Sequence, residues 1–239
     1  MIEIDNLTVM FGGVRGLNGL SATLPEPVTG LVGPNGAGKT TLINVLSGFV
    51  RPTAGTVRID GRDLAGIRPH KRAALGIRRT FQNEQVVENL SAADNVAAVL
   101  DNVPTGGEPR ARLIARALDF VGLLSKANAL GRDLNAFDRR MVEIARATVG
   151  RPKLIMMDEP GAGLAQEESE RLRDVIKAID GFCGAQVLLV DHDVDLISAT
   201  CVTALVLDFG SKLAYGPTTA VLADPKVRAA YLGVVEDAA

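Results

Sequence analysis

The 239-residue sequence predicts an α/β protein with a mostly parallel sheet, and three observations lead to this fold class. Short apolar runs recur late in the chain, at residues 154–157, 187–190 and 204–207. Helical stretches at 167–179 and 193–200 separate these runs. A glycine-rich segment that follows an early strand and precedes a helix is the third observation. Continuous apolar strands that alternate with helices are typical of a parallel sheet covered on both faces.

The N-terminal part of the chain predicts strands of a different kind. Residues 2–9 alternate between apolar and polar side chains, as in a strand that is buried on one face only. Pro25 ends a second extended stretch, and Gly48 is placed to end the first helix. We therefore expect strands at 2–9, 20–24, 28–32 and 57–59, and a helix at 41–47.

The middle of the chain, from Ser91 to about Gly150, is rich in alanine and arginine at helical spacing. Ser91 and Asp94 fit a capping box for a helix that runs through residue 100. Two further helices are expected at 110–121 and 139–149. This block predicts a helical insert inside the α/β protein.

The composition is that of an ordinary globular protein. Hydrophobic residues make up 47% and charged residues 23%, and 26 basic against 28 acidic side chains give a net charge of −2. This balance predicts neither nucleic-acid binding nor disorder. No apolar run approaches the roughly 18 residues of a membrane span, and two cysteines, Cys183 and Cys201, favour buried thiols over a disulfide framework. We expect a soluble, cytoplasmic protein.

The glycine-rich segment matches the pattern G-x-x-x-x-G-K-[ST] in full. Its residues are Gly33, Pro34, Asn35, Gly36, Ala37, Gly38, Lys39 and Thr40, and the helix begins near Thr41. Glycine allows several backbone N–H groups to turn toward one phosphate, and the start of the helix adds a positive dipole end. Lys39 then reaches the β- and γ-phosphates and the Thr40 hydroxyl ligates Mg²⁺. A simple glycine-rich turn is the alternative, and the flanking strand and helix favour nucleotide binding.

Two further strands deliver chemically useful side chains at their ends. Asp158 and Glu159 follow a buried run, at the edge where an open α/β sheet builds its site. There Asp158 would hold a metal through water, and Glu159 would act as general base. A strand that runs into a solvated turn is the alternative. His192 follows the run at 187–190, where a lone histidine is as a rule structural.

The whole pattern resembles the ATP-binding subunits of ATP-binding-cassette (ABC) transporters over essentially all 239 residues. The resemblance implies that Phe11, 22 residues before Gly33, stacks on adenine, and that Gln82 contacts Mg²⁺ and the transmembrane partner. It implies that His192 contacts the γ-phosphate. Asp158 and Glu159 fit the positions of the metal ligand and the general base.

The resemblance also implies a domain organisation. It predicts a single ABC domain over 1–239, with a P-loop core and an N-terminal antiparallel β subdomain in 1–82 and 151–239. A helical subdomain would occupy about 83–150. Expected ligands are ATP and Mg²⁺. Expected partners are transmembrane permease subunits, a second ATPase subunit and, indirectly, a periplasmic or extracellular substrate-binding protein, with the chain peripheral on the inner face of the plasma membrane.

Within this family, the chain is most similar to the ATPase subunits of branched-chain amino-acid importers. The segments that carry this resemblance are 79–83, 143–147 and 224–233. Lipopolysaccharide-export ATPases share a similar ending and a similar segment at 69–72, so an exporter subunit is the alternative.

The family signature, Leu-Ser-Gly-Gly-Gln, is altered in this chain. Counting back from Glu143 places residues 134–138 there, and their sequence is Leu-Asn-Ala-Phe-Asp. In the family this segment approaches the γ-phosphate held by the other subunit, and glycine allows that close approach. Phe137 adds bulk at this point. The Asp138 carboxylate repels the polyphosphate unless Mg²⁺ or Arg139 and Arg140 screen its charge. Ala165 likewise replaces the usual aspartate or asparagine of the D-loop.

These departures lead to two hypotheses about assembly. The chain would form one half of an asymmetric heterodimer, in which its intact phosphate loop works with the signature of a different partner. The rival from another class is a regulatory module that clamps ATP with little hydrolysis. A separate expectation is that residues 84–89 form the groove for a coupling helix of the permease, a solvated loop being the alternative.

Overall fold

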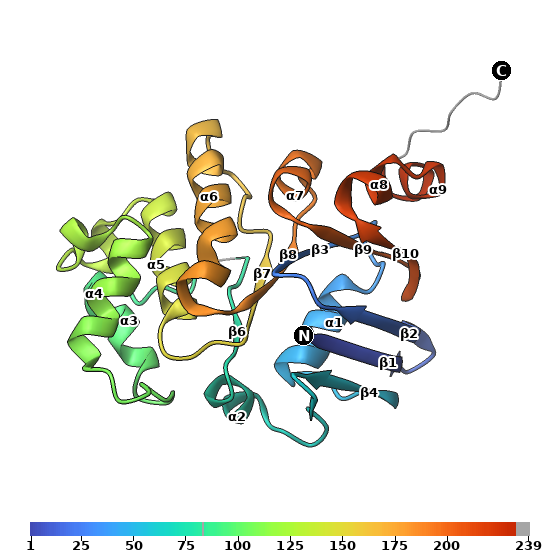
Figure 1. Cartoon of the computed structure of the whole chain (residues 1–239), viewed down its shortest axis with the longest axis horizontal. Coiled ribbons are helices and arrows are strands. Elements are labelled where there is room, and N and C mark those ends of the chain that lie inside the picture. Colours follow the sequence, from blue (N-terminus) through green and yellow to red (C-terminus); the bar gives the residue numbers. More distant parts are fainter. Residues whose placement is uncertain (83, 233–239) are drawn as a thin grey trace. The chain divides into compact units, whose positions relative to one another are not determined.

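The computed structural model describes residues 1–82 and 84–232 (Figure 1). Asn83 and Gly233, which belong to two of the segments that carry the subfamily resemblance, lie outside the described residues. The chain divides into two compact units, one formed by residues 1–69 and 188–239 and the other by residues 70–187. No helix within the described ranges is long and apolar enough to cross a membrane.

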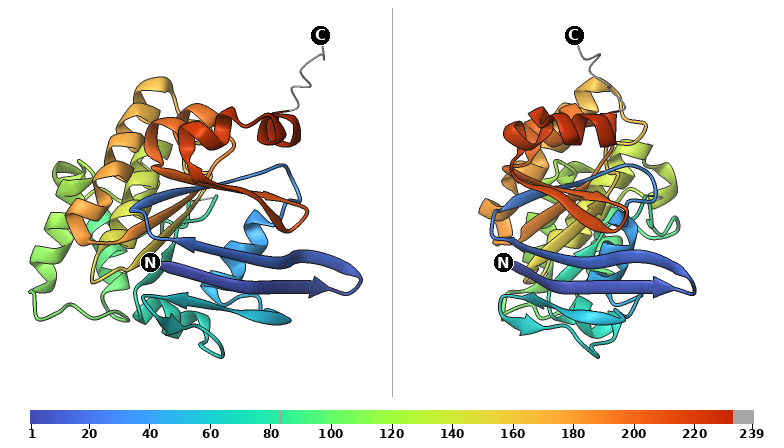
Figure 2. Two further views of the ribbon diagram at one scale, coloured as in Figure 1. Left: turned by 45° about the vertical axis from the view of Figure 1, so that its right-hand side comes forward. Right: turned by 90° about the vertical axis from the view of Figure 1, so that its right-hand side faces the viewer.

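The first unit contains the antiparallel sheet expected near the N-terminus. Its strand order is β2-β1-β4-β5, with β1 at Ile2–Phe11, β2 at Val14–Leu24, β4 at Ala54–Ile59 and β5 at Arg62–Asp63. The apolar side chains of β1 that alternate in the sequence are buried, as Ile2, Ile4, Leu7 and Val9 show. Figure 2 shows β1 and β2 as a long hairpin.

The first unit also holds the strand that leads into the glycine-rich loop. β3 (Val28–Val32) is buried at every residue and pairs in parallel with β9 (Thr203–Asp208). The first unit's helices are α1 (Lys39–Ser47), α7 (Val194–Thr200), α8 (Thr218–Ala223) and α9 (Pro225–Val227), followed by a π-helical turn at Arg228–Leu232. β3 ends at Val32, so the glycine-rich loop that follows it lies at the carboxyl edge of the strands.

Two strands of this unit, the short β5 and β10, were not predicted. β10 (Ser211–Pro217) runs antiparallel to β9. Its sequence includes a glycine and a proline, and its side chains are mostly half-buried, so it lacks the apolar run of a central strand.

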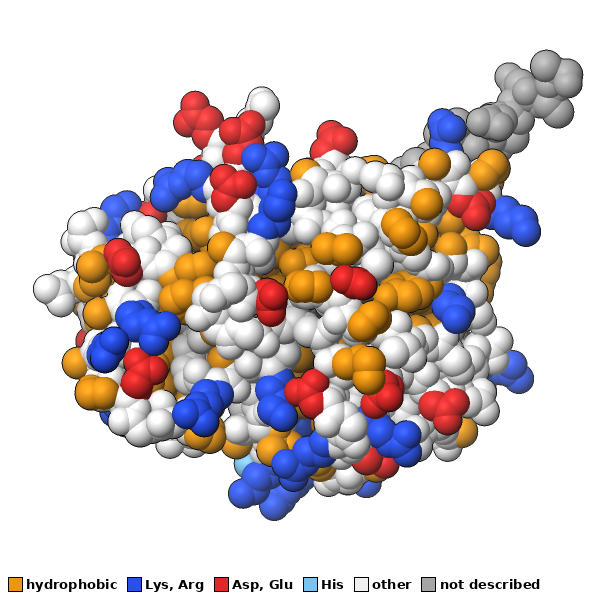
Figure 3. Space-filling view, in the orientation of Figure 1, with side chains coloured by type: hydrophobic (Ala, Val, Ile, Leu, Met, Phe, Trp, Pro, Cys, Tyr) orange, Lys and Arg blue, Asp and Glu red, His pale blue; other side chains and the backbone are white. Residues whose placement is uncertain are grey.

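The second unit combines two parallel strands with the helical insert. β6 (Ile77–Arg79) pairs in parallel with β7 (Leu154–Asp158), and β8 (Gln186–Val190) spans the boundary between the units. The helices are α2 (Pro69–Ala74), α3 (Ala92–Val99), α4 (Arg110–Phe120), α5 (Ala136–Thr148) and α6 (Gln166–Cys183). Figure 1 shows α3, α4 and α5 packed together. Acidic and basic side chains mix at the exposed end of α6 in Figure 3.

The capping residues explain which of the predicted helix starts agree with the structure and which do not. Ser91 caps α3 as expected, accepting a hydrogen bond from the Asp94 backbone N–H. α5 begins at Ala136 rather than at residue 139, because Asn135 accepts a hydrogen bond from the Asp138 N–H and caps the helix one turn earlier. The two cysteines are free, as predicted, with Cys201 buried and Cys183 half-buried.

Candidate functional site

The phosphate loop needs glycine because its backbone touches neighbouring backbone. Gly33 has φ 148° and Gly38 has φ 104°, in the region that side chains disfavour. A Cβ atom at Gly33 would lie 2.2 Å from the Leu207 carbonyl oxygen, and one at Gly38 would lie 2.6 Å from that of Gly16. The loop is therefore held tightly between β9 and the β1–β2 hairpin, and neither glycine can be replaced without moving the backbone.

The first turn of α1 presents positive charge to this loop. Gly38 is the N-cap and offers no side-chain acceptor to the helix N–H groups. Lys39 Nζ donates to the carbonyl oxygens of Gly33, at 2.5 Å, and Pro34, at 2.9 Å, so the ammonium lies against the loop. The Thr40 side chain is exposed in the same turn, where its hydroxyl can ligate a metal. Backbone N–H groups and an ammonium at one helix start form an anion site.

Phe11 lies beside the phosphate-loop helix. Its side chain is 50% exposed at the end of β1. A Cβ atom at Gly16 would lie 2.7 Å from Phe11 Cε2 and 3.2 Å from Thr41 Cγ2, so the ring and the Thr41 methyl border the same point. The structure thus brings together the aromatic ring and the start of α1, although 22 residues separate Phe11 from Gly33 in the sequence. An exposed ring face in this position can stack on a base.

His192 lies in the loop between β8 and α7, with its side chain 71% exposed. Its Nδ1 atom is 3.8 Å from Oδ1 of the buried Asp191, which also accepts a hydrogen bond from the Asp193 N–H. Asp193 in turn caps α7 through the N–H groups of Asp195 and Leu196. A histidine with this exposure does not belong to the core.

In the second unit, Asp158 ends β7 beside an arginine that the sequence analysis did not single out. Arg79, at the end of the neighbouring β6, places Nη2 2.8 Å from Asp158 Oδ2. Both side chains are largely buried, 13% and 15% exposed, and the Arg79 guanidinium also lies 5.0 Å from the centre of the Phe81 ring. Asp158 is therefore not part of a solvated turn. Arg79 lies just before Gln82 in the sequence, and this position could have identified it as a neighbour of the site.

Glu159 and Gln82 lie together, as the sequence analysis would require of a shared site. Gln82 Nε2 donates a hydrogen bond of 2.7 Å to Glu159 Oε2. Glu159 has φ 50°, an unusual backbone conformation for a residue other than glycine. Residues held in such conformations cluster at functional sites because the surrounding structure supplies the energy that the strain costs.

The residues assigned to the metal fit Mg²⁺ in their chemistry. The Thr40 hydroxyl, the Asp158 carboxylate and the Gln82 side-chain amide all offer oxygen, the ligand that Mg²⁺ prefers. Gln82 uses its nitrogen toward Glu159, and its amide oxygen is the atom that can ligate a metal. Thr40 belongs to the first unit, whereas Gln82 and Asp158 belong to the second.

The altered signature segment is engaged within its own unit. The Asn135 side chain caps α5, and the buried Asp138 carboxylate lies 2.5 Å from Lys126 Nζ. Phe137 is 4% exposed, with the Arg171 guanidinium 4.9 Å from its ring centre. The start of α5 thus carries an internal cap and an internal carboxylate, and both weaken its attraction for an outside anion.

Arg139 and Arg140, the two side chains that the sequence offered as possible screens for Asp138, bind other groups. Arg140 is buried and binds elsewhere, donating to the carbonyl oxygens of Phe81 and Gln82 and pairing with Glu84 at 2.8 Å. Arg139 donates to the Leu134 carbonyl oxygen. Lys126, in the short 3₁₀ turn Leu124–Lys126, is the partner instead. No sequence pattern identified this lysine, because the pairing depends on how the turn packs against α5.

Comparisons with known proteins identify the family of the chain. A family model described as "ABC transporter" matches residues 17–162, and one described as "Branched-chain amino acid ATP-binding cassette transporter" matches residues 211–237. The high-affinity branched-chain amino acid transport ATP-binding protein BraF of Pseudomonas aeruginosa is 34% identical, over 98% of both chains. The lipopolysaccharide export system ATP-binding protein LptB of Acidithiobacillus ferridurans is 36% identical over 86% of this chain and 85% of its own.

The fold is also that of solved cassettes. The ADP conformation of MJ1267, an ATP-binding cassette of an ABC transporter, superposes with a TM-score of 0.85 at 28% identity, covering 98% of this chain and 99% of its own. A relative above 30% identity over nearly its full length and a family model over more than half of the chain show the family. The chain therefore belongs to the ABC transporter family of ATP-hydrolysing, ATP-binding subunits, and within it is most like the branched-chain amino-acid importers.

Proposed function

We propose that this chain is an ATPase subunit of an importer for branched-chain or other amino acids, and that it works as one half of an asymmetric ATPase dimer. The observation that carries the asymmetry is the start of α5. There Asn135 caps the helix, Asp138 pairs with Lys126 at 2.5 Å, and Phe137 is buried. The similarity to BraF and the C-terminal family match support the amino-acid importer.

The chain's own residues supply one complete set of catalytic functions. The phosphate loop and Lys39 bind the β- and γ-phosphates of ATP, and Phe11 stacks on the adenine. Glu159, oriented by the hydrogen bond from Gln82, takes a proton from the attacking water as general base. His192 contacts the γ-phosphate. Thr40, Gln82 and Asp158 would hold Mg²⁺, which when bound neutralises the charge on the phosphates.

The signature segment of the same chain serves a partner's nucleotide poorly. A helix start binds phosphate when its N–H groups are open and no negative charge lies near them. Here the Asn135 oxygen already accepts the Asp138 N–H, and the Asp138 carboxylate stands in the first turn. A homodimer would carry this weakness twice, whereas a heterodimer with an ordinary partner keeps one sound site.

The groove for the permease is proposed at residues 84–89. Hydrogen bonds hold this segment on α3, because Asn95 accepts from the Val87 N–H at 2.8 Å and donates to the Val87 carbonyl oxygen at 3.0 Å. The Val87 side chain remains 50% exposed and can meet an apolar partner. The permease would bring the chain to the inner face of the plasma membrane, and the substrate-binding protein would act through the permease.

The test is ATP hydrolysis by the purified chain with and without its co-purified partner ATPase. The isolated chain should bind ATP and hydrolyse it feebly, and the partner should raise turnover strongly. Robust turnover by the isolated chain, dependent on its own dimerisation, would refute the asymmetric dimer.

A regulatory clamp with little hydrolysis is the second candidate, and the same engaged signature segment favours it. The two candidates differ in one result, because a clamp stays nearly inactive even with the partner present. The similarity to LptB supports a subunit of a lipopolysaccharide exporter as a further alternative. Uptake of labelled leucine by cells that express the complete transporter separates importer from exporter.

A further inference from the structure

Arg140 ties α5 to the Gln82 segment, by which we mean residues 81–82 and 84–85. Its guanidinium donates from Nη1 to the Phe81 carbonyl oxygen and from Nη2 to the Gln82 carbonyl oxygen, both at 3.4 Å. Nη2 also lies 2.8 Å from Oε1 of Glu84. The Arg140 side chain is only 3% exposed, so water competes little for these contacts. A planar guanidinium can hold several oxygens at once in a fixed geometry, which a lysine ammonium cannot do.

These contacts matter because the chain has left the sheet where the Gln82 segment begins. β6 ends at Arg79, and the Thr80 N–H still donates to the carbonyl oxygen of Met156 in β7, at 2.9 Å. Beyond Thr80, α5 supplies side-chain hydrogen bonds to the backbone. The position of the Gln82 segment therefore depends on side chains of α5 and not on a sheet ladder.

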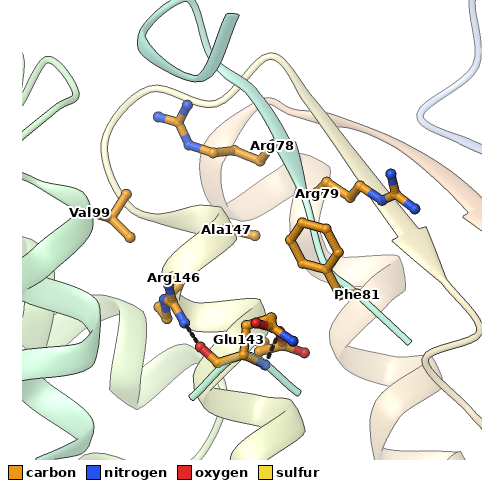
Figure 4. Close-up of a pocket in the computed structure, with 8 residues that line it drawn as sticks. Arg78, Arg79, Phe81, Val99, Glu143, Arg146 and Ala147 are labelled. Carbon is orange, nitrogen blue, oxygen red and sulfur yellow. Dashed lines mark hydrogen bonds between the residues drawn. The ribbon is translucent and has the colours of Figure 1, made fainter. Parts of the chain in front are cut away.

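The same face of α5 holds the segment at a second point (Figure 4). Glu143 Oε1 accepts a hydrogen bond of 2.9 Å from the Gln85 N–H, and Arg146 donates to the Gln85 carbonyl oxygen. Residues 140, 143 and 146 follow one another at a spacing of three, so they are neighbours on the helix surface. A row of charged side chains thus holds the segment, and Arg140 holds its N-terminal end.

Gln82 connects this row to the proposed general base. Its Nε2 atom donates the hydrogen bond of 2.7 Å to Glu159 Oε2, so the direction of that carboxylate depends on where the Gln82 backbone lies. A catalytic group must be held close to its productive geometry, and a misplacement of about 1 Å can reduce a rate about 100-fold. Loss of the two bonds from Arg140 would free the Gln82 backbone to make such a shift.

We propose that Arg140 is a positioning residue for ATP hydrolysis, which holds Gln82 so that Glu159 faces the attacking water. Arg140 acts through Gln82 and is not itself a catalytic residue. The inference rests on the proposed function, because it uses the roles proposed there for Gln82 and Glu159.

The experiment compares Arg140→Met and Arg140→Lys in the co-purified complex with the partner ATPase. Arg140→Met should lower kcat about tenfold or more and leave the Kd for ATP within about twofold, because the phosphate loop is unchanged. Arg140→Lys keeps the charge that faces Glu84 but loses the planar fork, so its kcat should be intermediate. This milder variant also keeps the test decisive if Arg140→Met does not fold.

Met141→Ala is the matched control for lost stability. Met141 is the next residue of α5 and is 1% exposed, so its truncation opens a cavity in the core and removes no hydrogen bond to the Gln82 segment. Thermal unfolding of the isolated chains shows how far each variant is destabilised. At a temperature where all of them are folded, Met141→Ala should keep the wild-type kcat.

A double-mutant cycle in kcat separates positioning from general structural support. If Arg140 acts through Gln82, then Arg140→Met should have little further effect in a Gln82→Ala background. Independent losses that multiply, or a wild-type kcat in both Arg140 variants, would overturn the inference and leave the proposed function intact. Normal turnover of a Glu159→Gln complex, or no turnover of the wild-type complex, would overturn the proposed function and the inference with it.

Discussion

Gln82 donates a hydrogen bond of 2.7 Å from Nε2 to Oε2 of Glu159. The two residues are 77 positions apart in the sequence, and Glu159 adopts φ 50° where β7 has just ended. This bond links the segment that leads toward the proposed permease groove to the proposed general base. A movement of that segment would therefore reorient the carboxylate that activates water.

Replacing Glu159 by glutamine should remove hydrolysis and keep ATP binding. Glutamine retains the shape of the side chain but cannot take a proton, so turnover should fall about 100-fold or more. Steady-state phosphate release and equilibrium binding of labelled ATP measure the two effects in the co-purified complex. Glu170→Gln, on the exposed face of α6, is the matched control and should leave both unchanged. A Glu159→Gln complex with normal turnover would assign the general base elsewhere.

Arg79→Met should destabilise the fold and not merely the site. The substitution leaves the largely buried Asp158 carboxylate without its 2.8 Å partner, at a cost of about 3 kcal/mol in the free energy of unfolding. Urea denaturation of the isolated chain measures this cost. The double variant Arg79→Met with Asp158→Asn should recover part of the loss, because it also removes the unpaired charge. An Arg79→Met chain as stable as the wild type would show that the pair contributes nothing.

The pair of Lys126 and Asp138 should show measurable coupling. Because the Asp138 side chain is only 9% exposed, its interaction with Lys126 should be worth about 1 kcal/mol. A double-mutant cycle with Lys126→Met and Asp138→Asn isolates this quantity. The same cycle between Arg139 and Asp138 should give a value near zero, since Arg139 binds other groups. The reverse ranking would show that Arg139, and not Lys126, screens Asp138.

Cys201 should make stability depend on pH above neutrality. Burial raises the pKa of its thiol from 9.0 to about 12, so the folded state holds this proton more tightly than the unfolded state does. The contribution of Cys201 is therefore fully present below pH 9 and is lost as the pH rises from 9 toward 12. The difference in unfolding free energy between wild type and Cys201→Ala should shrink over that range. A constant difference would contradict the raised pKa.

The elements that the sequence predicts best are those with local signals. The apolar run of β3, the capping residue Ser91 and the glycine pattern of the phosphate loop each depend on a few neighbouring residues, and each appears in the structure. β10 and the pairing of Lys126 with Asp138 depend on contacts between distant segments, so composition and periodicity could not reveal them. The domain boundaries proposed at residues 82 and 151 remain predictions.

The central claim is that one catalytic site of the dimer is sound and uses Glu159 of this chain. The most direct measurement is ATP turnover of the complex with its partner ATPase, with the general-base glutamate replaced by glutamine in one subunit at a time. Glu159→Gln should remove nearly all turnover, whereas the equivalent change in the partner should have little effect, because that site would use the engaged signature segment at residues 134–138. Equal losses from the two substitutions, or a larger loss from the partner's, would contradict the account.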